Sequence, residues 1–187
     1  MTKNYEPRQV FLVLCIATAI FSLILLLFIP QIIADIVHHT SGVWQVFVPK
    51  GNFVVYAVGF FLIFLSLFIL FILDIKKKSI LLSILCILLS IIPFYIGSQS
   101  YIIFANDSIS YSPIFSAEKK KYTWDELSAV TYFKAKEGEK SEYVFTFKDD
   151  NTITLEDNSY FGNIINPLQI KLKEIGIIFN KEGYSSE

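Results

Sequence analysis

The sequence predicts a membrane α-helical fold with three transmembrane helices, followed by a mainly β C-terminal domain that ends in a closing helix. Two observations support this class. Of the 187 residues, 53% are hydrophobic and only 18% are charged. The charged residues are segregated, because Gln9–Ala34, Gly51–Leu73 and Ser79–Asn106 contain none. Charges recur every few residues after Asp107, so we divide the chain into a transmembrane domain, 1–97, and a soluble domain, 98–187.

The charge-free stretches are long enough to cross a bilayer. A helix rising about 1.5 Å per residue needs roughly 20 apolar residues to span a hydrocarbon core of about 30 Å. We therefore predict spans near residues 10–29, 53–73 and 79–96. The first is longer than the apolar region of a signal peptide and no cleavage site follows it, so we expect it to remain as an anchor. Cys15 and Cys86 lie inside these stretches and are expected to act as small hydrophobic residues.

Residues 31–48, between the first two spans, are too polar to cross, since they contain Asp35 and two histidines. Aliphatic residues recur at helical spacing from Ile32 to Val37. This pattern predicts a short amphipathic helix lying at the membrane interface, with Trp44 at the level of the headgroups. Pro30 is expected to end or kink the first span.

Basic residues near the span ends predict the orientation. Lys3 and Arg8 precede the first span and Lys76–Lys78 fill the turn between the second and third, whereas the first loop offers only Lys50. The positive-inside rule then places the N-terminus in the cytoplasm. Three spans carry the C-terminal domain to the outer face of the cell membrane, in a multi-pass protein whose first partner is the lipid bilayer.

The soluble domain begins with a predicted hairpin and one capped turn. Strands are expected at Ser100–Ala105 and Ser108–Phe115, because both runs are β-rich and the turn-type pair Asn106-Asp107 separates them. Thr123–Glu126 has the spacing of a capping box, which predicts a short helical turn. We expect Trp124 to be buried where this turn meets the sheet.

Three more strands and a helix complete the predicted domain. Alternation predicts strands at Ala129–Lys136, Glu142–Phe147 and Thr152–Leu155, with a polar hairpin tip at Glu137–Lys140. The closing helix is predicted with Asn166 as its N-cap, Pro167 at its first position and Gly176 as its stop.

This order of elements resembles the bacterial pleckstrin-homology-like (PH-like) domains that are often attached to membrane spans. The resemblance covers roughly residues 100–180 and is carried by Tyr101–Ile103, Tyr122, Trp124, Asp125, Leu127, Val130 and the helix from Pro167. It implies an interaction or scaffold module. Only five or six strands are apparent where the eukaryotic relatives have seven, so we expect an incomplete barrel. The excess of lysine over arginine is typical of a low-GC bacterium.

The sequence predicts no catalytic, cofactor-binding or metal-binding residues. His38 and His39 are adjacent, so they point to different sides of a helix, and only Asp35 lies at a useful spacing for a shared metal. The predicted soluble domain has no histidine, no cysteine and no Gly-x-Ser-x-Gly motif, so no enzyme activity is expected. The predicted spans carry no ionisable residue that would mark an ion pathway. Gly59 has no small-x-x-x-small partner for helix pairing.

Charged groups in the soluble half are also explained by local structure. The acidic pairs Asp125-Glu126, Asp149-Asp150 and Glu156-Asp157 fall in no alternating calcium loop, and two of them lie in turn or capping contexts. Lys119–Lys121 could contact lipid headgroups. However, residues 98–187 hold 10 basic and 14 acidic side chains, a net charge of −4, so a solvated strand edge is favoured. Topological anchoring is likewise favoured over lipid recognition for Lys76–Lys78.

Two functions from different classes follow. The first is a non-enzymatic, membrane-anchored module whose sheet edge or helix groove binds a protein partner near the membrane. The second is an accessory subunit of a membrane complex, or a small transporter, whose spans carry the function. The net charge of −1 excludes a broadly basic nucleic-acid binder, and no small-molecule substrate is inferred.

Overall fold

The computed structural model describes residues 7–116, 118–134 and 140–183. Within them the chain forms four α-helices, eight strands and one 3-10 turn. In chain order these are α1 (Pro7–His38), β1 (Val43–Phe47), α2 (Lys50–Ile72), α3 (Lys77–Gln99), β2 (Tyr101–Ala105), β3 (Ser108–Ser112), β4 (Lys120–Thr123), the 3-10 turn η1 (Trp124–Glu126), β5 (Leu127–Lys134), β6 (Glu142–Phe147), β7 (Thr152–Glu156), α4 (Ser159–Glu174) and β8 (Phe179–Gly183).

The chain divides into two compact units. The first, the helical unit, contains Met1–His38, Val48–Tyr101 and Ser112–Glu118; the second, the β unit, contains His39–Phe47, Ile102–Tyr111 and Lys119–Glu187. The predicted fold class is confirmed, since three long apolar helices are followed by two β-sheets and a C-terminal helix. The boundary is not one cut near residue 97, because residues 39–47 group with the β unit.

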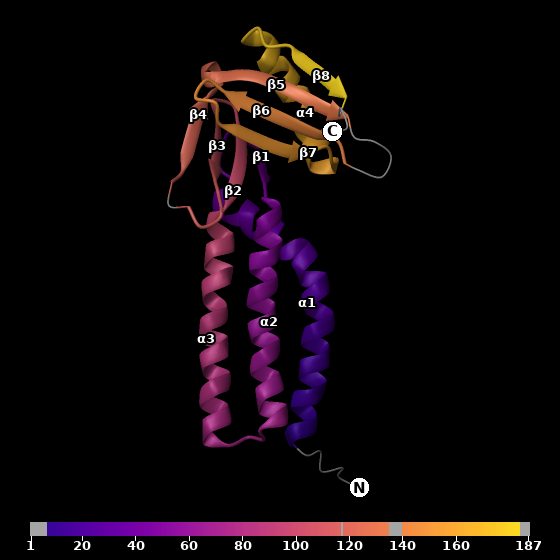
Figure 1. Cartoon of the computed structure of the whole chain (residues 1–187), viewed down its shortest axis with the longest axis vertical. Helices are drawn as coiled ribbons and strands as arrows, with labels where there is room; N and C mark the ends of the chain where they lie inside the picture. The colour runs from indigo at the N-terminus through magenta and orange to yellow at the C-terminus, as the bar shows by residue number, and fades with distance from the viewer. Residues whose placement is uncertain (1–6, 117, 135–139, 184–187) are drawn as a thin grey trace. The chain divides into compact units, whose positions relative to one another are not determined.

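The helical unit consists of α1, α2 and α3, each long and apolar enough to cross a membrane. Figure 1 shows α2 between α1 and α3, with the α2–α3 turn at the same end as the start of α1. At that end Arg8 lies 3.9 Å from Asp74 and its guanidinium lies over the Phe71 ring. Arg8 and Lys76–Lys78, four of the basic residues used to predict orientation, therefore lie at one end of the bundle.

A seam of small residues joins α3 to α2. The buried residues of α3 repeat at alternating intervals of four and three: Ser79, Ser83, Cys86, Ser90, Pro93 and Gly97. Small side chains let apolar helices approach closely. A Cβ on Gly97 would lie 2.6 Å from the Tyr56 ring, and one on Gly59 would lie 2.8 Å from the Phe94 ring. Gly59 is thus a close-packing position although it lacks the expected sequence partner.

The prediction of a separate interfacial helix over 31–48 is wrong. The aliphatic spacing from Ile32 to Val37 continues the first span in register, so α1 runs through Pro30 as far as His38. Proline removes only its own backbone hydrogen bond, which a helix can lose while neighbouring helices support it. Gly42 then turns the chain at a φ of 87°, and Val43–Phe47 forms strand β1.

Strand β1 completes the first sheet, whose order is β1-β2-β3-β4. It runs antiparallel to β2, with Phe47 opposite Ile102 and Val43 opposite Ala105. Asn106, at the predicted β2–β3 turn, secures it: the Asn106 amide donates to the Gly42 carbonyl at 2.9 Å, and Trp44 Nε1 donates to Asn106 Oδ1 at 2.6 Å. Trp44 therefore belongs to the β unit and not to an interfacial helix.

The second sheet has the order β7-β6-β5-β8 (Figure 1). Strands β5, β6 and β7 pair antiparallel, whereas β8 runs parallel to β5, with Phe179 opposite Val130. Among the described residues, seven strands, β1 to β7, precede α4, where five or six strands were expected. The two strands that were not predicted are β1, which comes from between α1 and α2, and β4. The predicted tip at Glu137–Lys140 lies largely outside the described residues.

The closing helix begins earlier than predicted. Asn158, not Asn166, is the N-cap of α4, and its side chain accepts a hydrogen bond from the Phe161 amide at 3.0 Å. Pro167 lies inside the helix. The predicted stop is confirmed: Gly176 has a φ of 74°, and the Ile177 amide donates to the Leu172 carbonyl at 2.9 Å, as in a Schellman motif.

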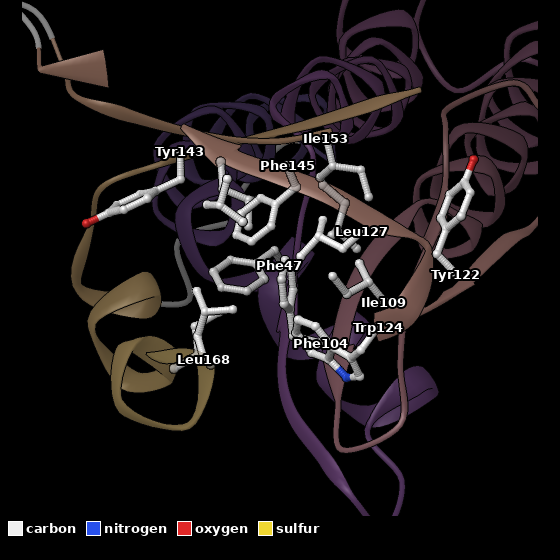
Figure 2. Packing of buried hydrophobic residues seen from close by; sticks show 14 of the residues in the cluster. Phe47, Phe104, Ile109, Tyr122, Trp124, Leu127, Tyr143, Phe145, Ile153 and Leu168 are labelled. Carbon is white, nitrogen blue, oxygen red and sulfur yellow. The ribbon is translucent and has the colours of Figure 1, made fainter. Parts of the chain in front are cut away.

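The core of the β unit is rich in aromatic residues and lies between the two sheets and α4. Figure 2 shows Phe47, Phe104 and Phe145 meeting at its centre, with Trp124 beside Phe104. Trp124 is 3% exposed, stacks on Trp44 at 5.3 Å between ring centroids and donates from Nε1 to the Ala105 carbonyl. The burial of Trp124 predicted from the sequence is confirmed.

Candidate functional site

His38, the first residue of the histidine pair, contacts the end of α3 and the start of β2. His38 Nε2 lies 2.8 Å from the Ser98 carbonyl oxygen, and its ring lies 4.1 Å from that of Tyr101. Asp35 accepts a hydrogen bond from Gln31 within α1. In the part of the chain that the structure describes, no group of three or more His, Cys, Asp or Glu side chains is arranged to hold a metal ion.

The acidic pairs are engaged in local structure. Glu126 accepts hydrogen bonds from the backbone amide and hydroxyl of Thr123, which confirms the predicted capping box. Lys140 lies 2.7 Å from Glu156, and Tyr132 donates to Asp157 at 3.3 Å. These contacts give the carboxylates structural roles.

Asp149 fixes the turn between β6 and β7. Its carboxylate accepts hydrogen bonds from Tyr122 Oη, at 2.8 Å, and from Asn151 Nδ2, while Lys120 donates to Asn151 Oδ1. Burial, reinforced by the hydrogen bond and charge of Asp149, raises the pKa of Tyr122 to about 12. Desolvation alone would raise the pKa of Asp149, but the hydrogen bonds from Tyr122 and Asn151 outweigh it and hold that pKa below its usual value. Lys120 is thus engaged within the domain, whereas Lys119 and Lys121 are exposed.

Two adjoining hollows follow the C-terminal part of α4 and the start of β8. The first, of about 320 Å³, is lined by Tyr132, Tyr143, Ile165, Gln169 and Phe179. The second, of about 460 Å³, is lined by Gln169, Leu172, Lys173, Gly176, Ile177, Ile178 and Phe179. They share Gln169 and Phe179, so together they form one surface, here called the α4–β8 groove.

The local sequence explains how this groove forms. The left-handed Gly176 reverses the chain at the end of α4, and the run Ile177-Ile178-Phe179 then leads into the edge strand β8. The inner face of α4 is buried through Phe161, Ile164, Leu168 and Leu172. Gln169 and Lys173, one turn apart on α4, are exposed and supply a polar rim.

The groove carries apolar surface that the core does not use. Ile178, which lines it, is 81% exposed. Among the described residues from Ser98 onward, the other large hydrophobic side chains that are exposed are Phe115, Tyr160 and Ile170, and the last two lie on α4. Exposed apolar groups within a groove and bordered by polar groups are typical of protein-binding sites. Neither β8 nor this groove was predicted, although a β-branched and aromatic run after a helix-stop glycine is a strand signal.

A further hollow, of about 290 Å³, lies between α1 and α2 in the helical unit. Ala19, Ser22, Leu23, Leu26, Ala57, Phe60, Phe61 and Phe64 line it. The Ser22 hydroxyl donates to the Ala19 carbonyl within α1. The lining therefore suits an apolar side chain or acyl chain and not an ion.

The chain was compared with protein families, curated proteins and solved structures. No family model matches the chain, and no curated protein does. Among solved structures, the chain is similar to the structure of the Spt16D Pob3N heterodimer, at 13% identity and a TM-score of 0.33. The match covers 47% of this chain and 48% of that one, so the chain spans about half the length of the matched structure.

Proposed function

We propose that this protein is a non-enzymatic, multi-pass membrane protein whose PH-like β unit binds a protein partner close to the membrane. The observation that carries the proposal is the α4–β8 groove, in which Ile178 is 81% exposed beside an edge strand. An extended segment with apolar side chains fits this surface, because β8 is an edge strand among the described residues and the groove offers apolar pockets. Gln169 and Lys173 can donate hydrogen bonds to its carbonyl groups.

Membrane attachment favours weak binding of this kind. A partner in the same membrane meets the groove at a high effective concentration, so a small interface suffices. The net charge of −4 over residues 98–187 opposes docking on an anionic lipid surface, which supports a protein over a lipid headgroup as the ligand of the groove.

Site-specific photo-crosslinking in intact cells tests the proposal. A photoreactive phenylalanine analogue replaces Ile178, and in a matched control it replaces Thr154, an exposed residue of β7. We expect a discrete crosslinked protein band from position 178 that is absent from position 154 and is recovered from detergent-solubilised membranes. Equal crosslinking at both positions, or none at 178, would contradict the proposal.

A second function rests on the hollow between α1 and α2. An accessory subunit would use it to receive a side chain from a helix of a larger membrane complex, or a small transporter would carry its function in these spans. Replacing Ala57 with Phe would fill this hollow, and loss of co-purification with a multi-span protein on this change alone would favour the second function over the first.

A further inference from the structure

The turn between β3 and β4 presents an exposed phenylalanine in an unusual conformation. The Ser116 amide donates to the Pro113 carbonyl at 3.2 Å, so Pro113–Ser116 is a four-residue turn with Ile114 and Phe115 at its centre. Phe115 has a φ of 61° and is 79% exposed. A positive φ at the third position of a turn favours glycine or asparagine, because a Cβ there meets the backbone.

Neither the backbone nor the core accounts for phenylalanine at this position. A glycine would relieve the strain, and a polar residue would remove an apolar ring from water. A single exposed hydrophobic residue needs no explanation by itself. A residue that is both exposed and held in a strained conformation does suggest a binding role.

The neighbours of the turn place it at the ends of two candidate spans. Ile114 packs on the first turn of α2, where a Cβ on Gly51 would lie 2.5 Å from Ile114 Cδ1. Ser100, which follows α3, donates from its hydroxyl to the Ser112 carbonyl at 2.9 Å. The segment Ser112–Glu118 accordingly belongs to the helical unit.

Hydrogen bonds join the start of α2 to the end of α3 beside this turn. The buried Asn52 side chain donates to the carbonyls of Gly97 and Ser100, both at 2.9 Å. The apolar run of α2 starts at Phe53, two residues beyond Gly51. At about 1.5 Å per helical residue, the turn therefore lies within a few ångströms of where the hydrocarbon core begins, if these helices cross the membrane as proposed.

We propose that Phe115 inserts into the interfacial layer of the bilayer, beside the start of α2, and fixes the depth of the helical unit in the membrane. The partner is the boundary between lipid headgroups and acyl chains, where aromatic side chains are favoured. Ile114 attaches the turn to α2, and the strained Phe115 presents its ring to the lipid. The inference rests on the proposed spans but not on the groove or on which side of the membrane the β unit lies.

Depth-dependent fluorescence quenching tests the insertion. In full-length protein with Cys15 and Cys86 changed to Ala, a single cysteine replaces Phe115, Thr154 or Phe61 and carries an environment-sensitive fluorophore. Thr154 is the exposed control in the β unit. Phe61, which is 59% exposed on the surface of mid-α2, is the control for a lipid-facing position deep in a proposed span. The proteins are reconstituted into phosphatidylcholine vesicles that contain lipids with a nitroxide at a shallow or a deep position.

The expected result is at least two-fold stronger quenching at position 115 than at position 154, with the shallow nitroxide more effective than the deep one. At position 61 the deep nitroxide should be the more effective. Quenching at 115 no greater than at 154 overturns the insertion if position 61 behaves as expected. If the deep nitroxide is not the more effective quencher at position 61, the proposed spans themselves are wrong. If the fluorophore at position 115 is shielded from water in native membranes but not in pure lipid vesicles, the partner is a protein, and this result would also overturn the proposal.

The Phe115→Gly variant provides a second measurement. Its thermal midpoint in detergent should be unchanged or higher, because glycine relieves the positive φ, while its vesicles should show weaker shallow quenching from a fluorophore placed at Ser116. A lowered midpoint would show that the Phe115 ring supports the fold, which would contradict a membrane role.

Discussion

Strand β1 should decide whether the β unit can fold apart from the membrane. Residues 98–187 look like a complete soluble domain in the sequence, but that fragment lacks Val43–Phe47. Val46 is fully buried and Phe47 is 6% exposed, with its ring 5.8 Å from Phe104 and 6.4 Å from Phe161. Each such side chain contributes about 1.5–3 kcal/mol through burial, so the fragment loses about 3–6 kcal/mol.

This loss is a large share of the stability expected for the domain. A domain of the size of fragment 98–187 is typically stable by roughly 5–13 kcal/mol, at about 0.05–0.15 kcal/mol per residue. With a urea dependence of about 1–3 kcal/mol per molar, the unfolding midpoint should fall by about 2 M when β1 is absent. The edge of β2 would also be left unpaired and open to aggregation.

A shortened version restores the strand without the helices. Because Phe47 lies opposite Ile102 in an antiparallel pair, residues 39–48 can be joined to residues 101–187 through Asn-Gly, the preferred two-residue hairpin turn. We expect this version to unfold cooperatively in urea, at a midpoint about 2 M above that of fragment 98–187, and Phe47→Ala in it to cost about 3–5 kcal/mol. Equal midpoints for the fragment and the shortened version would refute the role assigned to β1.

Four further predictions follow from individual contacts. Trp124→Ala should destabilise the shortened version by about 3–5 kcal/mol in urea unfolding, since the ring is buried in the core. Gly97→Ala should lower the thermal midpoint of the whole protein in detergent, because overpacking of this kind costs about 1–3 kcal/mol. Folding lowers the pKa of Asp149, so its carboxylate stabilises the folded state above the unfolded pKa, and this stabilisation is lost as the pH falls through the folded pKa. Asp149→Asn should therefore remove that part of the acid dependence of urea unfolding. For orientation, a cysteine at Ser141 should react with an impermeant maleimide in intact cells, and one at Lys78 only after permeabilisation.

Each of these has a contrasting control. Gly162 lies in α4 with open space around it, so Gly162→Ala should be neutral or stabilising, in contrast to the change at Gly97. An unchanged urea-unfolding midpoint for the Trp124→Ala variant would contradict the contribution of that ring to the core. An Asp149→Asn variant with the same acid dependence as the parent would show that its hydrogen bonds contribute nothing measurable. Lys78 is a suitable labelling site because its side chain is exposed, whereas the next residue, Ser79, is buried.

The features that local chemistry determines could be predicted from the sequence. The three helices follow from charge-free stretches of the right length, and the strand at Glu142–Phe147 follows from strict alternation. The capping box at Thr123 and the stop at Gly176 were found because each depends on residues within a few positions of one another.

The features that depend on pairing between distant residues could not be predicted from the sequence. Val43–Phe47 becomes a strand because β2, more than fifty residues later, supplies its hydrogen bonds. Its β-branched and aromatic residues favour a strand, but they suit an interfacial segment equally well. The start of α4 was misplaced because Asn166-Pro167 is an equally good local N-terminus, while burial of Phe161 and Ile164 extends the helix back to Asn158. The groove was missed because it exists only once β8 lies beside β5.

The pairing of β1 with β2 also constrains the topology. The segment that joins α1 to α2 contributes a strand to the β unit, so it must lie on the same side of the membrane as that unit. Helices α2 and α3 therefore cross the bilayer as a pair or not at all, and the N-terminus lies opposite the β unit if α1 crosses. If maleimide labelling gives the reverse of the expected pattern, the β unit lies in the cytoplasm with the α2–α3 turn outside, and the positive-inside prediction is wrong.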